Sequence, residues 1–118
     1  METKGAVAAL GALAQETRLA AFRVLVEAGP AGIAAGALAA KLDVPPPTLS
    51  FHLTALANAG LIAATRDGRS IVYAADFAAM NALVGFLTEN CCGGDPGACA
   101  PAACPPAKRT PTRRKVLA

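Results

Sequence analysis

The four cysteines of the chain are gathered in one short stretch, and the first two are adjacent. They are Cys91, Cys92, Cys99 and Cys104. Glycines and a proline between the pair and Cys99 allow the backbone to turn sharply there. An adjacent pair with a third thiol on such a turn suits a soft ion with three sulfur ligands. Trivalent arsenic is such an ion, because soft thiolates select soft centres. We predict that Cys91, Cys92 and Cys99 bind it.

Entropy alone does not decide which cysteine is the third ligand. Closing the loop from Cys92 to Cys104 in place of Cys99 costs only about 0.5 kcal/mol more, so Cys104 remains a substitute. Arsenite, methylarsenite and antimonite all remain open as the bound species. A disulfide framework is not expected, because cytoplasmic thiols stay reduced. Zinc is disfavoured, since the spaced Cys-x2-Cys pairs of zinc sites are absent.

Two other roles for the cysteines do not involve a metal. Cys92 and Cys99 could form a reversible disulfide, which would make the protein a thiol redox or persulfide sensor. A thiol enzyme is disfavoured, because no basic side chain stands beside the cysteines and no catalytic base is visible. We therefore expect neither enzymatic activity nor an organic cofactor.

A helix in the middle of the chain is predicted to position the residues that contact a partner. Leucines spaced by 4 and 3 define its apolar face: Leu49, Leu53 and Leu56. The helix should begin near Pro46 or Pro47, since proline suits a first turn, and Gly60 should end it in a left-handed conformation. The residues that we expect to contact DNA are Thr48, Ser50, Phe51 and His52. For His52, packing against the preceding turn is the alternative.

The rest of the chain is predicted to form a mainly α-helical frame with a small β-hairpin. Apolar periodicity predicts helices over Ala6–Ala14, Glu16–Glu27, Ile33–Leu42 and Phe77–Glu89. The third helix, the proline turn and the central helix make a helix-turn-helix. Strands are expected over Leu61–Thr65 and Ser70–Ala74, joined by a type I′ turn at Asp67-Gly68. This order of elements is that of a winged helix.

Several arginines have expected partners. Arg66 and Arg69 at the tip of the hairpin suit contact with phosphates or with the minor groove, and an ordinary charged hairpin is the alternative. Arg18 is predicted to pair with Glu16 or Asp43. Residues 108–118 hold five basic side chains and no acid, a tail that aids solubility or contacts phosphates.

Composition limits the size of the core. The chain has 118 residues, rich in alanine and with only 4% aromatics, so we expect a second copy to complete its burial in a homodimer. No apolar stretch is long enough to span a membrane, and the N-terminus is unlike a secretory signal. We therefore expect a cytoplasmic protein with no membrane partner. A folded domain over residues 1–90 and a flexible tail over 91–118 are expected.

The ordered series of segments resembles the ArsR/SmtB family of bacterial metal-responsive repressors. The resemblance covers about residues 6–89 and is carried by Glu16-Thr17-Arg18-Leu19, Thr48-Leu49-Ser50-Phe51-His52-Leu53, Ala59-Gly60-Leu61-Ile62 and Arg66-Asp67-Gly68-Arg69. It implies a winged helix-turn-helix that binds operator DNA, with a dimer formed by the first and last helices. Some arsenic repressors of this family also carry a Cys-Cys pair after the last helix, with a third cysteine soon after.

The chain departs from the family pattern at the places where ligands are bound. The founding arsenic sensors carry thiols in the helix before the turn, where this chain has none. Its last helix also lacks the histidine and carboxylate set of the zinc sensors. We therefore expect a repressor that leaves double-stranded operator DNA when arsenite binds the cysteines beyond the last helix. A DNA-binding protein without any ligand response is a further alternative.

Overall fold

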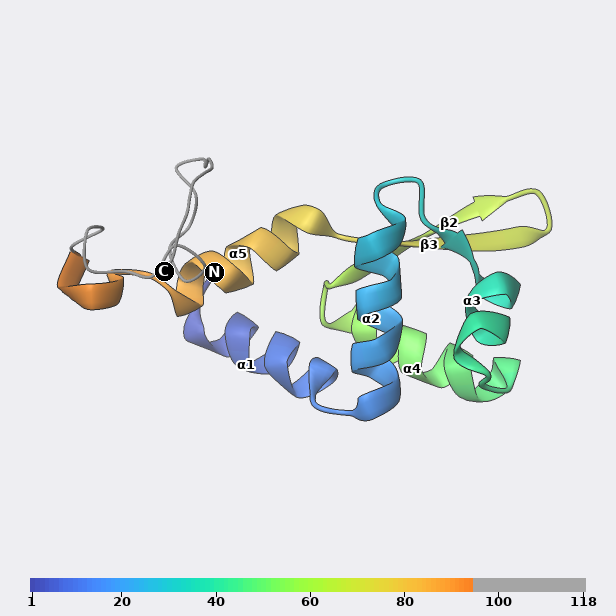
Figure 1. The fold of residues 1–118 in the computed structure, drawn as a ribbon, viewed down its shortest axis with the longest axis horizontal. Coiled ribbons are helices and arrows are strands. Elements are labelled where there is room, and N and C mark those ends of the chain that lie inside the picture. Colours follow the sequence, from blue (N-terminus) through green and yellow to red (C-terminus); the bar gives the residue numbers. More distant parts are fainter. Residues whose placement is uncertain (95–118) are drawn as a thin grey trace, which may run out of the picture.

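The computed structural model describes residues 1–94 of the chain, and Figure 1 shows how their helices and strands are arranged. The helices are α1 (Thr3–Leu13), α2 (Glu16–Ala28), α3 (Ala35–Leu42), α4 (Pro46–Asn58) and α5 (Phe77–Leu87), followed by one 3-10 turn, η1 (Cys91–Gly94). The strands are β1 (Ile33–Ala34), β2 (Ile62–Asp67) and β3 (Ser70–Ala75). The predicted mainly α-helical winged helix is confirmed. Cys99, Cys104 and the basic stretch at 108–118 lie outside the described residues.

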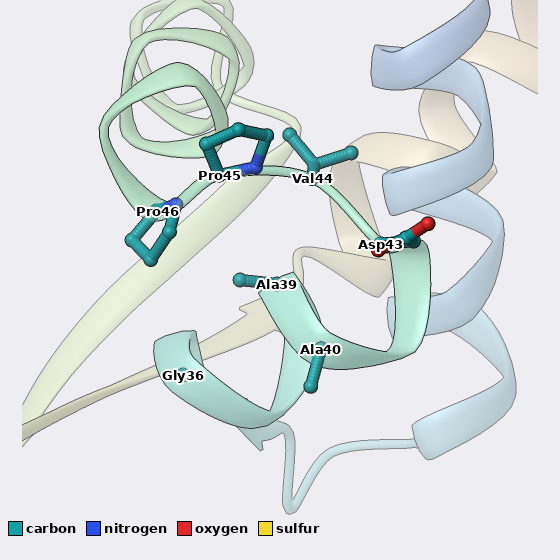
Figure 2. Close-up of a pocket in the computed structure, with 7 residues that line it drawn as sticks. All are labelled: Gly36, Ala39, Ala40, Asp43, Val44, Pro45 and Pro46. Carbon is teal, nitrogen blue, oxygen red and sulfur yellow. The ribbon is translucent and has the colours of Figure 1, made fainter.

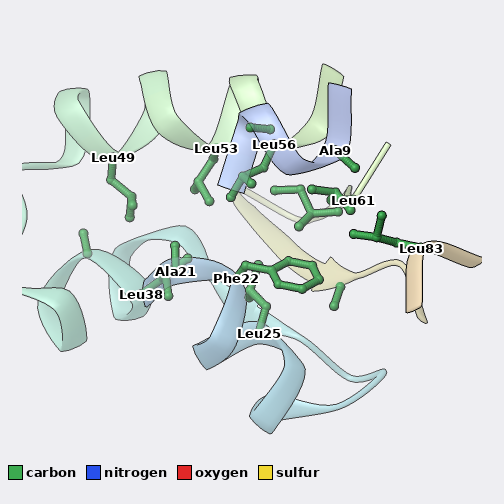
Figure 3. Packing of buried hydrophobic residues seen from close by; sticks show 14 of the residues in the cluster. Ala9, Ala21, Phe22, Leu25, Leu38, Leu49, Leu53, Leu56, Leu61 and Leu83 are labelled. Atoms are coloured by element: carbon green, nitrogen blue, oxygen red, sulfur yellow. The ribbon is translucent and has the colours of Figure 1, made fainter. Parts of the chain in front are cut away.

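The hydrophobic core lies between α2, α3 and α4 and is made mainly of leucine. Its largest fully buried side chains are Leu25, Leu38, Leu49, Leu53, Leu56 and Leu61. Figure 3 shows the leucines of α4 pointing toward α2 and α3, which confirms the apolar face predicted from their spacing. No polar or charged side chain is buried among residues 1–94. Burying one leucine contributes about 1.5–3 kcal/mol, so this leucine core is the main source of stability in this part of the chain.

Helices α1 and α5 form a thinner layer at the end of the molecule away from the hairpin (Figure 1). Helix α1 is buried through Ala6, Ala9 and Ala12, whose side chains are small. Four large apolar side chains of these two helices remain 42–62% exposed, and together they are named the α1–α5 surface here: Val7, Leu10, Val84 and Leu87. None of the helices formed by residues 1–94 is both long and apolar enough to cross a membrane.

The end of α4 is fixed by a Schellman motif. Gly60 takes a left-handed conformation with φ of 80°, as predicted from the sequence. Its N–H donates to the Ala57 carbonyl at 2.9 Å, and the Leu61 N–H donates to the Leu56 carbonyl at 3.1 Å. Because Leu56 and Leu61 are both fully buried, the same motif anchors the chain that leaves α4 to the core.

Helix α3 ends in the same way, but with a residue that pays a steric cost. Asp43 occupies the left-handed position with φ of 55°. The N–H groups of Asp43 and Val44 donate to carbonyls of the last turn at 3.2 and 3.1 Å. A residue with a Cβ is less favourable than glycine in this conformation, although aspartate tolerates it better than most.

The sheet has three antiparallel strands in the order β1-β3-β2, one strand more than predicted. Ile33 pairs with Tyr73 and Ala34 with Val72, so the prediction that a helix begins at Ile33 was wrong. The physical reason is a close approach at Gly32, which has φ of 75°. A Cβ there would collide with the Tyr73 carbonyl oxygen, so only glycine lets the chain lie against β3 in extended form before α3 begins at Ala35.

The hairpin turn lies one residue further along than predicted. Asp67 pairs with Ser70, which leaves Gly68 and Arg69 as the two loop residues. Positive φ occurs at Gly68, at 64°, but at neither Asp67 nor Arg69. Type I′ needs positive φ at both central positions, so that prediction was wrong. Glycine at the first central position is the pattern of a type II′ turn.

Candidate DNA-binding surface and thiol site

Helix α4 separates a buried face from a face of mixed polar and aromatic side chains. Leu49, Leu53 and Leu56 are at most 1% exposed. Thr48, Ser50 and Phe51 are all exposed, as their predicted contact with DNA requires. Because successive helix residues are about 100° apart, Phe51 lies about 200° around the helix from Leu49 and points away from the core. The first turns of α4 therefore present a hydroxyl-rich surface with one aromatic ring.

His52 lies on the flank of α4 that faces α2 and is half-buried. Its Nδ1 accepts a hydrogen bond from Arg18 Nε at 3.1 Å. A neutral imidazole that accepts at Nδ1 carries its proton on Nε2, so the second ring nitrogen is a donor. His52 thus packs against α2. The alternative predicted from the sequence was packing against the turn before α4. Its contact with a base remains a prediction.

Arg18 contacts α4 and not a carboxylate. Its predicted partners were Glu16 and Asp43, but its Nε donates to His52, and its guanidinium carbon lies 5.6 Å from the centroid of the Phe51 ring. The Phe51 and His52 rings are 5.6 Å apart and inclined at 64°. A cation over an aromatic face contributes about 0.5–1 kcal/mol at an exposed site. Arg18, Phe51 and His52 therefore form one cluster, named the arginine–aromatic cluster here.

The beginning of α4 has few backbone donors. Pro45 is its N-cap, and Pro46 and Pro47 are its first two residues, so none of these positions has an N–H group. The Leu49 N–H donates to the Pro45 carbonyl at 3.0 Å. Thr48 therefore supplies the remaining N–H of this first turn. Helix N-termini bind phosphates through such groups, and α4 offers fewer of them than an ordinary helix does.

The wing carries the two predicted arginines on exposed backbone. Arg66 is paired with Ile71 in the β2–β3 ladder, and Arg69 is in the turn. Both side chains are exposed. The hairpin projects from the end of the molecule that also holds α3 (Figure 1). This position suits the predicted contact of the wing arginines with DNA.

A hollow of about 490 Å³ lies at the junction of α3 and α4 (Figure 2). Alanine, glycine and proline line most of it, and Asp43 is its one ionisable residue. It therefore holds no sulfur ligand, in line with the absence of cysteine from the helix before the turn. Within residues 1–94, no group of three or more histidine, cysteine and carboxylate side chains is placed to bind a metal ion.

A second hollow, of about 430 Å³, lies between α2 and α5. Apolar side chains line it, including Leu19, Phe22 and Met80, with Arg23 and Glu27 as its charged residues. Leu19 is 46% exposed beside it. Val84 lines this hollow and also belongs to the α1–α5 surface, so the two are continuous.

The adjacent cysteines follow closely on α5. The helix ends at Leu87, two residues earlier than predicted, and the Thr88 hydroxyl donates back to the Val84 carbonyl at 2.8 Å. The Cys91 N–H then donates to the Thr88 carbonyl at 3.0 Å. Cys91 is half-buried and Cys92 is exposed. Two of the four predicted ligand candidates are thus placed by the structure, and Cys99 and Cys104 lie beyond it.

The backbone around the cysteine pair is tightly bent. Asn90 and Cys92 have φ of 56° and 55°, and Gly93 has φ of 68°. The left-handed conformation costs roughly 1–2 kcal/mol for a residue with a Cβ. The sequence analysis relied on the glycines and missed that the bend begins at Asn90, although asparagine adopts the left-handed conformation more readily than most residues.

These features define a winged helix-turn-helix protein. Residues 13–64 match the family described as a helix-turn-helix domain. The solved ArsR-like transcriptional regulator from Rhodococcus sp. RHA1 is 32% identical to this chain, with a TM-score of 0.63 over 71% of this chain and 76% of that one. The chain belongs to the ArsR family of transcriptional regulators.

Other solved structures are similar to the chain as well. NolR from Sinorhizobium fredii is 31% identical, with a TM-score of 0.55 over 73% of this chain and 83% of that one. A homodimeric winged helix-turn-helix DNA-binding domain from Mycobacterium bovis, described as a possible ArsR-family regulator, is 27% identical. Its TM-score is 0.59 over 79% of this chain and 86% of that one. No curated protein gives a significant match to the chain.

Proposed function

We propose that this ArsR-family regulator is a cytoplasmic repressor that binds operator DNA as a homodimer and leaves it when trivalent arsenic binds its cysteines. The ligands are Cys91, Cys92 and a third thiol, Cys99 or in its place Cys104. The observation that carries the proposal is the position of the adjacent cysteines, which begin four residues after the last residue of α5. Soft thiolates in this number suit a soft three-coordinate ion.

The DNA-binding half of the proposal rests on α4 and the wing. Thr48, Ser50 and Phe51 are exposed on the face opposite the buried leucines, and Arg66 and Arg69 are exposed on the hairpin. Hydroxyl groups bond to base edges, and arginines bind phosphates or enter the minor groove. A recognition helix with a wing beside it is the arrangement that the family uses on operator DNA.

The proposal that the protein is a homodimer rests on the α1–α5 surface. Val7, Leu10, Val84 and Leu87 are 42–62% exposed on helices that are otherwise packed against the core. Apolar side chains gathered at one end of a small protein favour association with another chain. The homodimeric relative from Mycobacterium bovis supports a second copy as the partner.

Coupling between the cysteine site and the DNA-binding surface follows from the connectivity of the chain. A closed three-thiol site would pull on the Thr88–Cys91 turn, which is hydrogen-bonded to the end of α5. Because α5 belongs to the dimer surface, arsenic would favour one angle between the two DNA-reading heads over another. Such coupling is reciprocal, so operator DNA should weaken arsenic binding by the same factor.

The test is release of operator DNA by arsenite, followed by fluorescence anisotropy. A Cys91→Ser, Cys92→Ser variant should bind the operator as the natural chain does and should lose its response to arsenite. Cys104→Ser is the matched control and should keep the response if Cys99 is the third ligand. The proposal would be wrong if the double variant released operator DNA at the arsenite concentration that releases the natural chain.

A thiol redox or persulfide sensor is the second candidate, and the exposure of Cys92 favours it. An accessible thiolate is open to attack by peroxide, and the sulfenic acid that forms condenses with a second thiol to a disulfide, with loss of water. Release by peroxide without release by arsenite would select this candidate. Release by arsenite under reducing conditions would exclude it as the main response.

A further inference from the structure

Phe51 places a large apolar ring at the centre of the face with which α4 is proposed to read DNA. It is 67% exposed, more than any other large apolar side chain of residues 1–94. A single exposed apolar residue is ordinary on a protein surface. This one differs because its surroundings hold the ring in place and because two threonines, Thr48 and Thr54, lie on the same face of the helix.

The arginine–aromatic cluster orders the ring before any partner binds. The Arg18 guanidinium carbon is 5.6 Å from the Phe51 ring centroid, and the His52 ring meets it edge-on at 5.6 Å. Arg18 is itself fixed by its 3.1 Å hydrogen bond to His52 Nδ1. A side chain that is already immobilised loses little conformational entropy when it binds, so its contacts contribute more fully to affinity.

The chemistry around the ring selects one kind of base. Thr48 and Thr54 are three residues to either side of Phe51 and lie on its face of the helix. The Thr48 hydroxyl can donate to an acceptor on a base edge, whereas the Thr54 hydroxyl already donates its one proton to the Ser50 carbonyl at 2.9 Å. In the major groove, thymine alone combines an acceptor, O4, with an apolar group, the C5-methyl. A ring beside a hydroxyl is complementary to that pair.

We infer that Phe51 is a specificity-determining residue that contacts the C5-methyl group of one thymine in each half-site of the bound DNA. The inference rests on the proposed function, because it requires α4 to lie in the major groove. Arg18 is then a positioning residue, which acts on DNA only through the ring that it holds.

The test begins with duplexes selected from a random pool by the full chain. Each thymine of the selected site is then replaced, one at a time, by deoxyuridine, which removes only the methyl group. Burying a methyl-sized group contributes about 0.8 kcal/mol, which corresponds to about fourfold in Kd. We expect a loss of about fourfold at one thymine per half-site, and of about fifteenfold when both are replaced.

The residue responsible is identified with Phe51→Ala, which should bind the thymine and deoxyuridine duplexes equally. Because Phe51 is largely exposed, this variant should fold normally. The matched control is Ile71→Ala, which removes another exposed apolar side chain, 38% exposed on β3. The control should keep the fourfold preference for thymine.

The outcomes separate this inference from the proposed function. A selected site that tolerates deoxyuridine at every position would overturn the inference and leave DNA binding intact. A preference for thymine that persists in Phe51→Ala would overturn it as well, because another residue would then read the methyl group. If no duplex is selected at all, DNA binding fails and the inference fails with it.

Discussion

The leucine core and the α1–α5 surface bury apolar area in different ways. Between α2, α3 and α4, six large aliphatic side chains are fully buried within one chain. At the other end, α1 is buried through alanines, and the larger residues Val7, Leu10 and Leu87 stay exposed. The first region is complete without a partner, whereas the second leaves four large apolar side chains exposed for contact with another surface. The leucine core should thus be stable alone, whereas the α1–α5 surface should depend on association with another chain.

The strongest test of this contrast is truncation in the leucine core. Leu56→Ala removes a side chain that is 0% exposed, and we expect it to lower the free energy of unfolding by about 2–5 kcal/mol, through lost burial and the cavity left behind. Urea unfolding followed by circular dichroism measures the change. Leu87→Ala, at a position that is 57% exposed, is the control and should cost much less in the monomer. Similar losses of unfolding free energy in both variants would contradict the difference between the leucine core and the α1–α5 surface.

A smaller effect is expected from a charge on the α1–α5 surface. Leu87→Lys should place an unpaired ammonium group in an apolar interface, at a cost of roughly 2 kcal/mol or more, which is about thirtyfold in the dimer dissociation constant. Sedimentation equilibrium measures that constant. Ile71→Lys, on the exposed side of β3, is the control and should leave it unchanged. Equal dissociation constants for the natural chain and Leu87→Lys would place the dimer interface elsewhere.

The smallest predicted effect concerns Asp43 at the end of α3, beside the leucine core. Asp43→Gly should raise the free energy of unfolding by about 0.5–1 kcal/mol, because glycine adopts the left-handed conformation freely and the change removes a negative charge from the end of α3. Asp43→Ala removes the same charge but keeps the Cβ and loses the tolerance of aspartate for the left-handed conformation, so it should not stabilise. An equal gain in both variants would mean that charge, and not backbone strain, is the cause. Thermal unfolding at fixed protein concentration resolves the difference, and the dimer dissociation constant should not move.

Local patterns made much of the fold predictable. The leucine spacing in α4 and the position of Gly60 depend only on residues close in sequence, and both predictions are confirmed. Strand β1 was missed because two residues carry no periodicity of their own. Its extended form comes from pairing with Tyr73, forty positions along the chain from Ile33. The hairpin loop was misplaced by one residue for a related reason, since cross-strand pairing keeps Asp67 in the ladder.

The candidate site likewise combines features set by local sequence with features set by long-range packing. Exposure of Thr48, Ser50 and Phe51 follows from the helix period, so the sequence could predict it. The contact between Arg18 and His52 joins residues 34 positions apart, and no spacing rule connects them. Opposite charge alone favoured a carboxylate, that of Glu16 or Asp43, as the partner of Arg18. Packing of α2 across α4 brought it to an imidazole and an aromatic ring.

The proline-rich start of α4 has a consequence for how DNA binding should respond to salt. With no N–H at Pro45, Pro46 or Pro47, the helix contributes little main-chain grip on phosphates, which is left to cationic side chains such as Arg66 and Arg69. Each phosphate neutralised by such a side chain releases condensed counterions, and that release sets the slope of affinity against ionic strength. The part of the chain described by the structure offers few such cations beside α4. The hold of residues 1–94 on DNA should therefore come mainly from groove contacts and persist at ionic strengths that detach more strongly basic proteins.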